Sequence, residues 1–267
     1  MGYSLMILLH LSHDMSVETM TAMLILLATV YAIGLMLGTR LLYGVDRLSL
    51  NNEVAGFKFA VIGVFYAVLL AFVVVAVWEE FRQTESAVRD EAKAAVDLYR
   101  VTLALPDKLG SEIREPLLTY VKDVPEYEWP TMGLGLPSDV VIKDLAQLNK
   151  AILNANPETR QQLALYQDAL RLLARITDNR TERLDSADGS MPGILWFVLI
   201  FGGLITLGYP AFFGSTNVGA QILMTASLAV LVAIAMLLGI VFDYPFTGDV
   251  HISALPFAQA LQQMRPV

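Results

Sequence analysis

The sequence predicts an all-α membrane protein with four transmembrane helices and a helical, water-facing insert between the second and third of them. Of 267 residues, 55% are apolar and only 16% are charged, and the mean hydropathy is +0.55. A soluble domain usually has about a quarter charged residues. Residues 79–190 carry 34 of the 44 charged side chains, whereas residues 189–242 carry none. Alternation typical of strands is not sustained anywhere, so the class is all-α.

Composition also excludes several functions. The formal net charge of −8 provides no basic surface for nucleic acid. The absence of cysteine excludes disulfides, thiolate metal sites and cysteine nucleophiles.

Three uncharged stretches define the spans: residues 19–39, 59–78 and 189–242. A helix needs about 20 apolar residues to cross the hydrocarbon core. The third stretch is long enough for two spans, and Gly214-Ser215-Thr216-Asn217 is its natural turn. We therefore predict four transmembrane helices, near 20–39, 58–78, 192–213 and 219–242.

The segments between these spans complete the division of the chain. Residues 1–19 form a short N-terminal lead-in, 20–78 hold the first two spans, 79–190 form the insert, 191–242 hold the last two spans, and 243–267 form a C-terminal segment. The lead-in contains His10, His13 and Asp14, three potential metal ligands without a fourth, and an amphipathic interfacial segment is the favoured interpretation.

The insert is predicted to be helical. No glycine or proline interrupts the 42 residues from Val64 to Leu105, so the second span should continue into water as one helix until Pro106. A second uninterrupted run covers Glu158–Asp188, with an apolar seam broken at Thr177 and Arg180. Shorter helices are expected near 108–123 and 138–154, separated by a loop with Trp129-Pro130 and Gly133-Leu134-Gly135.

Orientation follows from the positive charges near the span ends. Seven positive charges lie near the span ends on the insert side: Arg82, Arg89, Lys93, Arg175, Arg180, Arg183 and Arg265. Three lie on the other side, in the loop 40–57 and at Lys58: Arg40, Arg47 and Lys58. This excess predicts that the insert and both termini are cytoplasmic, although loops beyond about 60 residues count weakly, and discounting the insert inverts the topology.

No catalytic constellation is present, so we expect no enzyme, no cofactor and no metal site. The histidines lie outside the spans, and there is no nucleophile elbow or phosphate-binding glycine loop. Asp, Glu and His are absent from the middle of every span, which disfavours a proton-driven carrier.

Two patterns in the first two spans indicate helix packing. Gly34 and Gly38 form a small-xxx-small pair, and Gly56 and Gly63 lie seven residues apart on one helical face. An apolar stripe follows the second span at intervals of three or four residues: Val61, Phe65, Leu69 and Phe72. By itself such a stripe is more often core or lipid-facing than a pore lining.

Short motifs resemble those of bestrophin channels. Val61-Ile62-Gly63-Val64-Phe65-Tyr66-Ala67-Val68, followed by Trp78, is similar to the bestrophin pore helix, and Asp243-Tyr244-Pro245-Phe246-Thr247-Gly248-Asp249 resembles the segment after the last bestrophin span. Asn51-Asn52-Glu53-Val54-Ala55-Gly56-Phe57 resembles uncharacterised bacterial proteins described as bestrophin-like, which implies the bacterial inner membrane.

The resemblance implies a homopentameric channel for inorganic ions, with the second helix of each copy around a central pore. The Phe-Tyr match implies Phe65 as a neck residue, and helical spacing adds Val61, Leu69 and Phe72. Glu79 and Glu80 are candidates for the pore mouth, where a ring of carboxylates would favour cations.

The calcium clasp of animal bestrophins does not carry over, because only Asp243 and Asp249 flank the turn. The turn residues Asp243, Pro245, Phe246, Gly248 and Asp249 are instead expected to cap the last helix and dock on the insert.

Two other functions remain open. The chain could be a membrane scaffold or sensor whose insert binds a partner protein, or, less favoured, a carrier. The scaffold would lack the ion conduction that the channel requires.

Overall fold

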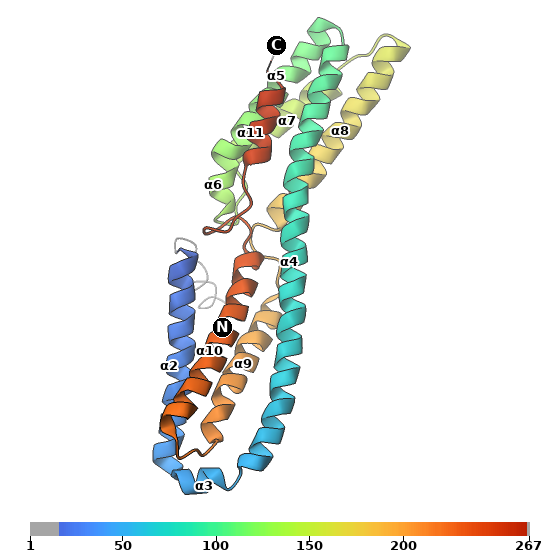
Figure 1. Cartoon of the computed structure of the whole chain (residues 1–267). Helices are drawn as coiled ribbons and strands as arrows, with labels where there is room; N and C mark the ends of the chain where they lie inside the picture. Colours follow the sequence, from blue (N-terminus) through green and yellow to red (C-terminus); the bar gives the residue numbers. More distant parts are fainter. Residues whose placement is uncertain (1–15, 266–267) are drawn as a thin grey trace. The chain divides into compact units, whose positions relative to one another are not determined.

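The computed structural model describes residues 16–265, and within them every regular element is helical and no β-strand forms. The all-α prediction is therefore confirmed. The elements follow in the order α2 (Val17–Tyr43), α3 (Val45–Ser49), α4 (Asn52–Ala104), α5 (Asp107–Asp123), the π-helix η1 (Val124–Glu128), α6 (Trp129–Met132), α7 (Asp139–Leu153), α8 (Arg160–Asp185), α9 (Gly193–Gly208), the 3₁₀ helix η2 (Tyr209–Phe212), α10 (Val218–Asp243) and α11 (Leu255–Gln263) (Figure 1).

Four helical segments of the described chain are long and apolar enough to cross a membrane. They are α2, α4, Gly193–Phe212 and α10. All four coincide with the predicted spans, and the predicted turn at Gly214–Asn217 separates the last two. The predicted continuation of the second span is also present, because α4 is one helix of 53 residues that ends just before Pro106.

The chain forms two compact units. The membrane unit comprises the described chain up to Glu79, Met191–Asp243 and Gly248–Val250. The insert unit comprises Glu80–Ser190, Tyr244–Thr247 and the described residues from His251 onward. The C-terminal segment that follows α10 therefore contributes to both units.

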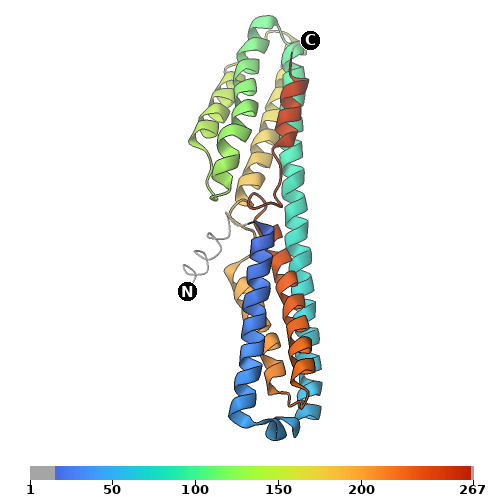
Figure 2. The ribbon, with the colours of Figure 1, turned by 60° about the vertical axis from the view of Figure 1, so that its left-hand side comes forward.

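In the membrane unit, α2, α9 and α10 lie side by side with the first part of α4 (Figures 1 and 2). The apolar core contains ten buried side chains from these helices: Ala32, Tyr66, Leu70, Val73, Val77, Trp196, Leu199, Leu207, Ala229 and Val232. The short helix α3, which the sequence pattern did not predict, occupies the loop between α2 and α4 and follows Gly44 at φ 75°.

In the insert unit, the water-side part of α4 packs with α5, α7, α8 and α11 around a second apolar core. The predicted loop at Trp129-Pro130 is wrong, since η1 and α6 continue the helical path beyond α5. Each proline stands within the first two residues of its short helix, at the point where the helix type changes. The chain turns only at Gly135, which has φ 68°.

Candidate pore helix and its supports

Helix α4 has two different faces in the membrane unit. Tyr66, Leu70, Val73 and Val77 recur at intervals of four, three and four residues, and all are buried against the membrane-unit core. The opposite face is exposed in the single chain. It carries four valines at intervals of seven residues, Val54, Val61, Val68 and Val75, which are 57%, 59%, 50% and 64% exposed. Large apolar side chains thus form a row that no other helix among residues 16–265 covers.

The predicted neck residues divide between these two faces. Phe65 and Phe72 are 74% and 72% exposed and lie seven residues apart beside the valines, and Val61 belongs to the valine row. Leu69 is different, because it is only partly exposed and packs against the core. The predicted stripe therefore drifts off the exposed face at Leu69, since an α-helix advances 100° per residue. The role of these residues in a pore stays a prediction.

Close packing on the buried face of α4 depends on glycines that the sequence reasoning missed. The Tyr66 hydroxyl donates to the Leu199 carbonyl at 3.2 Å. A Cβ added at Gly202 would lie 2.8 Å from the Tyr66 ring, and one at Gly203 would lie 2.9 Å from its hydroxyl. The consecutive glycines of α9 therefore make room for this aromatic side chain, and the Gly-Gly pair was the signal in the sequence.

Within the described part of the chain, the predicted packing glycines do not make close contacts with other helices. A Cβ at Gly34, Gly38 or Gly63 would meet nothing within 4 Å, and one at Gly56 would only touch the Phe213 ring at 3.8 Å. If these glycines allow close helix packing, the packing has to be between copies of the chain. That role stays a prediction.

The two predicted pore-mouth glutamates have different surroundings. Glu79 is exposed and follows Phe65 and Phe72 at the next interval of seven residues. Glu80 belongs to the insert unit, where its Oε1 accepts a hydrogen bond from the Ser186 hydroxyl at 3.2 Å. A carboxylate already bonded to Ser186, the residue that follows α8, is less available to a pore than the exposed one.

The turn after α10 uses its two carboxylates to bond N–H groups. Asp243 is buried, and its two oxygens accept from Met191 N at 2.9 Å and from Trp196 Nε1 at 3.1 Å, which ties the end of α10 to the start of α9. Asp249 accepts from Val17 N at 3.0 Å, at the start of α2.

The remaining turn residues shape the chain between these contacts. Pro245 O accepts from Ile252 N at 2.8 Å, and the buried Phe246 ring packs edge-on against Trp129 at 5.7 Å within the insert unit. Gly248 adopts φ 67°, a left-handed conformation that favours glycine. Across residues 16–265, no group of three or more His, Asp or Glu side chains is placed to hold a metal ion; His10, His13 and Asp14 lie outside the described residues.

A buried ionic network organises the insert unit. Arg183 is fully buried; its Nε donates to Glu91 Oε2 at 2.8 Å, and its Nη2 donates to Glu128 Oε2 at 2.8 Å. Arg180 makes a second ion pair with Glu128, with Nη2 at 2.5 Å from Oε1. The Tyr120 hydroxyl completes the network by donating to Glu91 Oε1 at 2.6 Å. The buried polar groups of α4, α5, η1 and α8 thus find their hydrogen-bond and ion-pair partners in one another.

The network sets the charge states of Arg183 and Tyr120. Burial by itself would lower the pKa of the Arg183 guanidinium, but the charge and hydrogen bonds of Glu91, together with the charge of Glu128, raise this pKa overall. Burial, and then the charge of Glu91, raise the pKa of Tyr120 well above its ordinary value. Arg183 therefore stays charged and Tyr120 stays a neutral donor. The guanidinium also lies 5.1 Å from the centre of the Trp129 ring.

Comparison with known proteins identifies the family. A family model for the Bestrophin-like domain matches residues 25–257. The chain belongs to the bestrophin-like family. No curated protein sequence matches it.

Solved structures agree with the bestrophin-like fold. A tyrosine-to-alanine variant of a bacterial bestrophin homologue from Klebsiella pneumoniae matches with a TM-score of 0.64 at 15% identity, over 90% of this chain and 96% of that one. A tryptophan-to-alanine variant of the Klebsiella homologue gives a TM-score of 0.64 at 14% identity, over 94% of this chain and 97% of that one. The structure of the Klebsiella homologue that was phased with zinc gives a TM-score of 0.60 at 15% identity, over 91% of this chain and 96% of that one.

One motif of the bestrophin-like chain has a clear structural role. The Asn52 side chain forms two hydrogen bonds with Gly214: Nδ2 donates to its carbonyl at 2.7 Å, and Oδ1 accepts from its N–H at 2.9 Å. Arg40 adds a bond from Nη1 to Ser215 O at 2.6 Å. The Asn51-Asn52-Glu53 motif thus joins the start of α4 to the turn between α9 and α10.

The ionic network is the main feature of this bestrophin-like chain that sequence reasoning missed. Glu91 lies among exposed charged neighbours in the sequence, and nothing in its spacing distinguishes it from them. The interruption of the apolar seam at Arg180 was the available signal, because a charge in such a seam needs a partner.

Proposed function

We propose that this bestrophin-like chain is a subunit of an oligomeric ion channel, with α4 of each copy lining a central pore. The observation that supports the proposal is the exposed apolar row on α4. A row of valines repeated every seven residues suits parallel helices that pack around an axis. Five copies are what the resemblance to bestrophins suggests.

Within this pore, the neck would be formed by side chains next to the valine row. Phe65 and Phe72 are large and well exposed there, and together with Val61 they would constrict an apolar passage that gates by dewetting. Leu69 is expected to contribute less, because it packs partly inside its own subunit.

The charge at the pore mouth favours cations in this proposal. Glu79 continues the line of Phe65 and Phe72, so that five copies would form a ring of carboxylates. Glu80 is held by Ser186 and is expected to influence the ion less.

We further propose that the insert and both termini face the cytoplasm of a bacterial inner membrane. Arg180 and Arg183 are committed to the buried network, so they do not act as free flanking charges. Without these two, five of the seven positive charges remain on the insert side, against three on the other, which still favours this orientation.

The proposal is tested by ion flux from liposomes that contain the purified, size-defined oligomer, under sodium, potassium or chloride gradients. We expect flux above that of empty vesicles, and a Phe65→Ser variant should increase the leak several-fold, because a hydroxyl wets the neck. Phe197→Ser on α9 is the matched control. Phe197 is 55% exposed and stacks on Phe201 of the same helix, with ring centroids 5.7 Å apart.

Two results would contradict the channel. One is the absence of flux from a well-folded oligomer at several pH values and calcium concentrations, which would favour the scaffold or sensor. The other is an equal increase of leak in the Phe197→Ser control, which would indicate general damage to the bilayer seal.

A further inference from the structure

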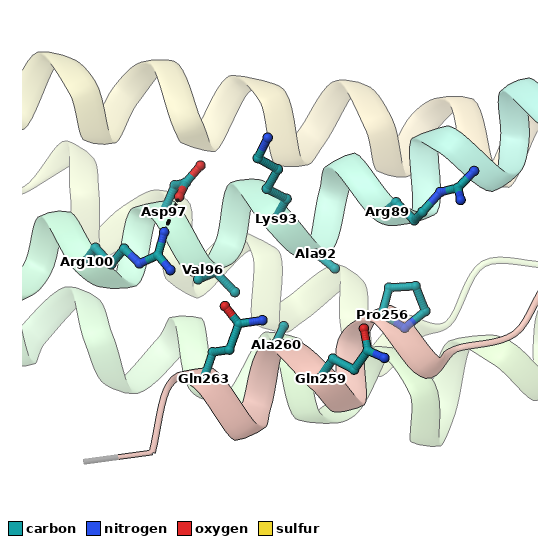
Figure 3. A pocket seen from close by; sticks show the side chains of 10 residues that line it. All are labelled: Arg89, Ala92, Lys93, Val96, Asp97, Arg100, Pro256, Gln259, Ala260 and Gln263. Carbon is teal, nitrogen blue, oxygen red and sulfur yellow. Dashed lines mark hydrogen bonds and ion pairs between the residues drawn. The ribbon is translucent and has the colours of Figure 1, made fainter. Parts of the chain in front are cut away.

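A groove runs between α4 and α11 within the insert unit. Its volume is about 420 Å³, which lies in the range of small-molecule sites. The floor is formed by small, buried apolar side chains, Ala92 and Val96 from α4 and Ala260 from α11. Figure 3 shows these residues between the two helices, with polar side chains around them.

The rim of this groove is positively charged, although the chain as a whole has a net charge of −8. Arg89, Lys93 and Arg100 line it together with a single carboxylate, Asp97. The two arginines are eleven positions apart on α4, which corresponds to about 16 Å along the helix. The groove thus presents three cations to one anion over a length that suits a small organic molecule.

The donors of these cations are only partly used. Arg89 Nη2 bonds Glu85 at 3.1 Å, and Arg100 Nη1 bonds Asp97 at 3.1 Å. Each guanidinium has five N–H groups, so both retain donors for a ligand. Lys93 is exposed and has no hydrogen-bond or ion-pair partner among residues 16–265.

The opposite wall is supplied by two glutamines of α11. Gln259 and Gln263 are four residues apart on one face of the helix, and their amides reach toward α4 (Figure 3). Amide N–H₂ groups donate to carboxylate and phosphate oxygens, as arginine and lysine do. Donors from both helices therefore surround an apolar floor.

We propose that this groove binds a small organic anion, with an apolar body on Ala92, Val96 and Ala260 and a carboxylate or phosphate group bound by those rim donors that lie within its reach, drawn from Arg89, Lys93, Arg100 and the two glutamines. The ligand site is independent of ion conduction. It would give the insert a means of sensing an acidic metabolite whether or not α4 lines a pore.

The first test is calorimetric titration of the purified full-length oligomer with phenyl phosphate and with benzoate, at constant ionic strength set by chloride. Saturable binding of one probe is expected, and the preferred probe separates a phosphate ligand from a carboxylate ligand. Lys93→Gln and Gln263→Glu should each weaken binding about threefold to fivefold, as expected for one exposed charge contact.

Matched variants control for general charge effects. Lys150→Gln removes an exposed lysine of α7, and Gln262→Glu adds a carboxylate to α11 beside, but not in, the groove. Both should leave binding unchanged within about twofold. No saturable binding at about 10 mM of either probe, or equal weakening in the controls, overturns the proposal.

Labelling of a single thiol tests whether the groove is open. The chain has no cysteine, so Gln263→Cys introduces one thiol on the groove wall. In the native oligomer this thiol should react with a maleimide, and the bound anion should slow the reaction. A thiol that reacts only after unfolding would show that another copy of the chain covers the groove, which also overturns the proposal.

Discussion

The membrane unit and the insert unit are both helical, yet different interactions position their helices. In the membrane unit, the contacts depend on shape: Gly202 and Gly203 receive the Tyr66 side chain, and Gly214 lies against α3. In the insert unit, a core of apolar side chains surrounds Arg183, Glu91 and Glu128, whose charges are fully buried. The first unit should therefore be sensitive to added volume, and the second to the loss of a charged partner.

The largest effect is expected from Arg183→Met in the insert unit. The change leaves Glu91 and Glu128 buried with one cation fewer, and breaking a buried pair in this way costs about 3–5 kcal/mol. Chemical unfolding of the detergent-solubilised protein, with hydrogen exchange of α5 and α8, measures the loss.

The control for this change is Arg171→Met. Arg171 pairs with Asp168 on the surface, where both side chains are more than half exposed, so its loss should cost less than about 0.5 kcal/mol. Equal losses in the two variants would show that the buried network does not stabilise the insert.

An intermediate effect is expected from Gly214→Ala in the membrane unit. The added Cβ would lie 2.7 Å from Val45 O and closer still to the backbone N of Ser49. Overpacking of this kind costs about 1–3 kcal/mol, and it would also disturb the two bonds between Asn52 and Gly214. Thermal unfolding of the purified protein measures it.

Gly219→Ala provides the comparison, because a Cβ there would only meet Asn217 Oδ1 at 3.7 Å. In helix α10 this alanine should be neutral or stabilise by up to about 1 kcal/mol. A Gly214→Ala protein as stable as Gly219→Ala would mean that the loop yields to the extra methyl group.

The smallest effect is expected at Asp144 of α7, a carboxyl group of the insert unit that is incompletely hydrogen-bonded. Its Oδ2 is buried without a hydrogen-bond partner, and burial, followed by the charge of Asp123, raises the pKa of this carboxyl above its ordinary value of 3.8. The folded state therefore holds the proton more tightly than the unfolded state. The contribution of this carboxyl to stability is therefore fully present below the ordinary pKa and is lost as the pH rises through the raised one.

Asp144→Asn should remove this dependence and stabilise the protein at neutral pH by about 1 kcal/mol. Unfolding curves across the acidic range check both statements. Asp178→Asn, at an exposed position of α8, is the control and should change stability by less than about 0.5 kcal/mol. An Asp144→Asn protein whose stability keeps the same pH dependence as the wild type across this range would contradict the prediction.

Much of the fold could be predicted because it depends on local patterns. Uncharged stretches located the four spans, and the absence of glycine and proline after Val64 predicted the length of α4. Proline was misleading at Trp129-Pro130, since its effect depends on whether it starts or interrupts a helix.

The site could be predicted only in part. Spacing selected Val61, Phe65 and Phe72, which do lie on the exposed face of α4, but it also selected Leu69, which packs partly into the core. Periodicity defines a stripe, whereas the neighbouring helices decide which side of that stripe is covered.

By itself the sequence determined the helical class, the membrane spans, the long second helix and the family resemblance, because these depend on composition and on spacing along one chain. Only the tertiary structure decided the partners of Arg183, the two-sided bonding of Asn52 to Gly214, the contacts of Asp243 and the groove beside α11. These features join residues far apart in the chain, and their free energy depends on burial and geometry that no local pattern records.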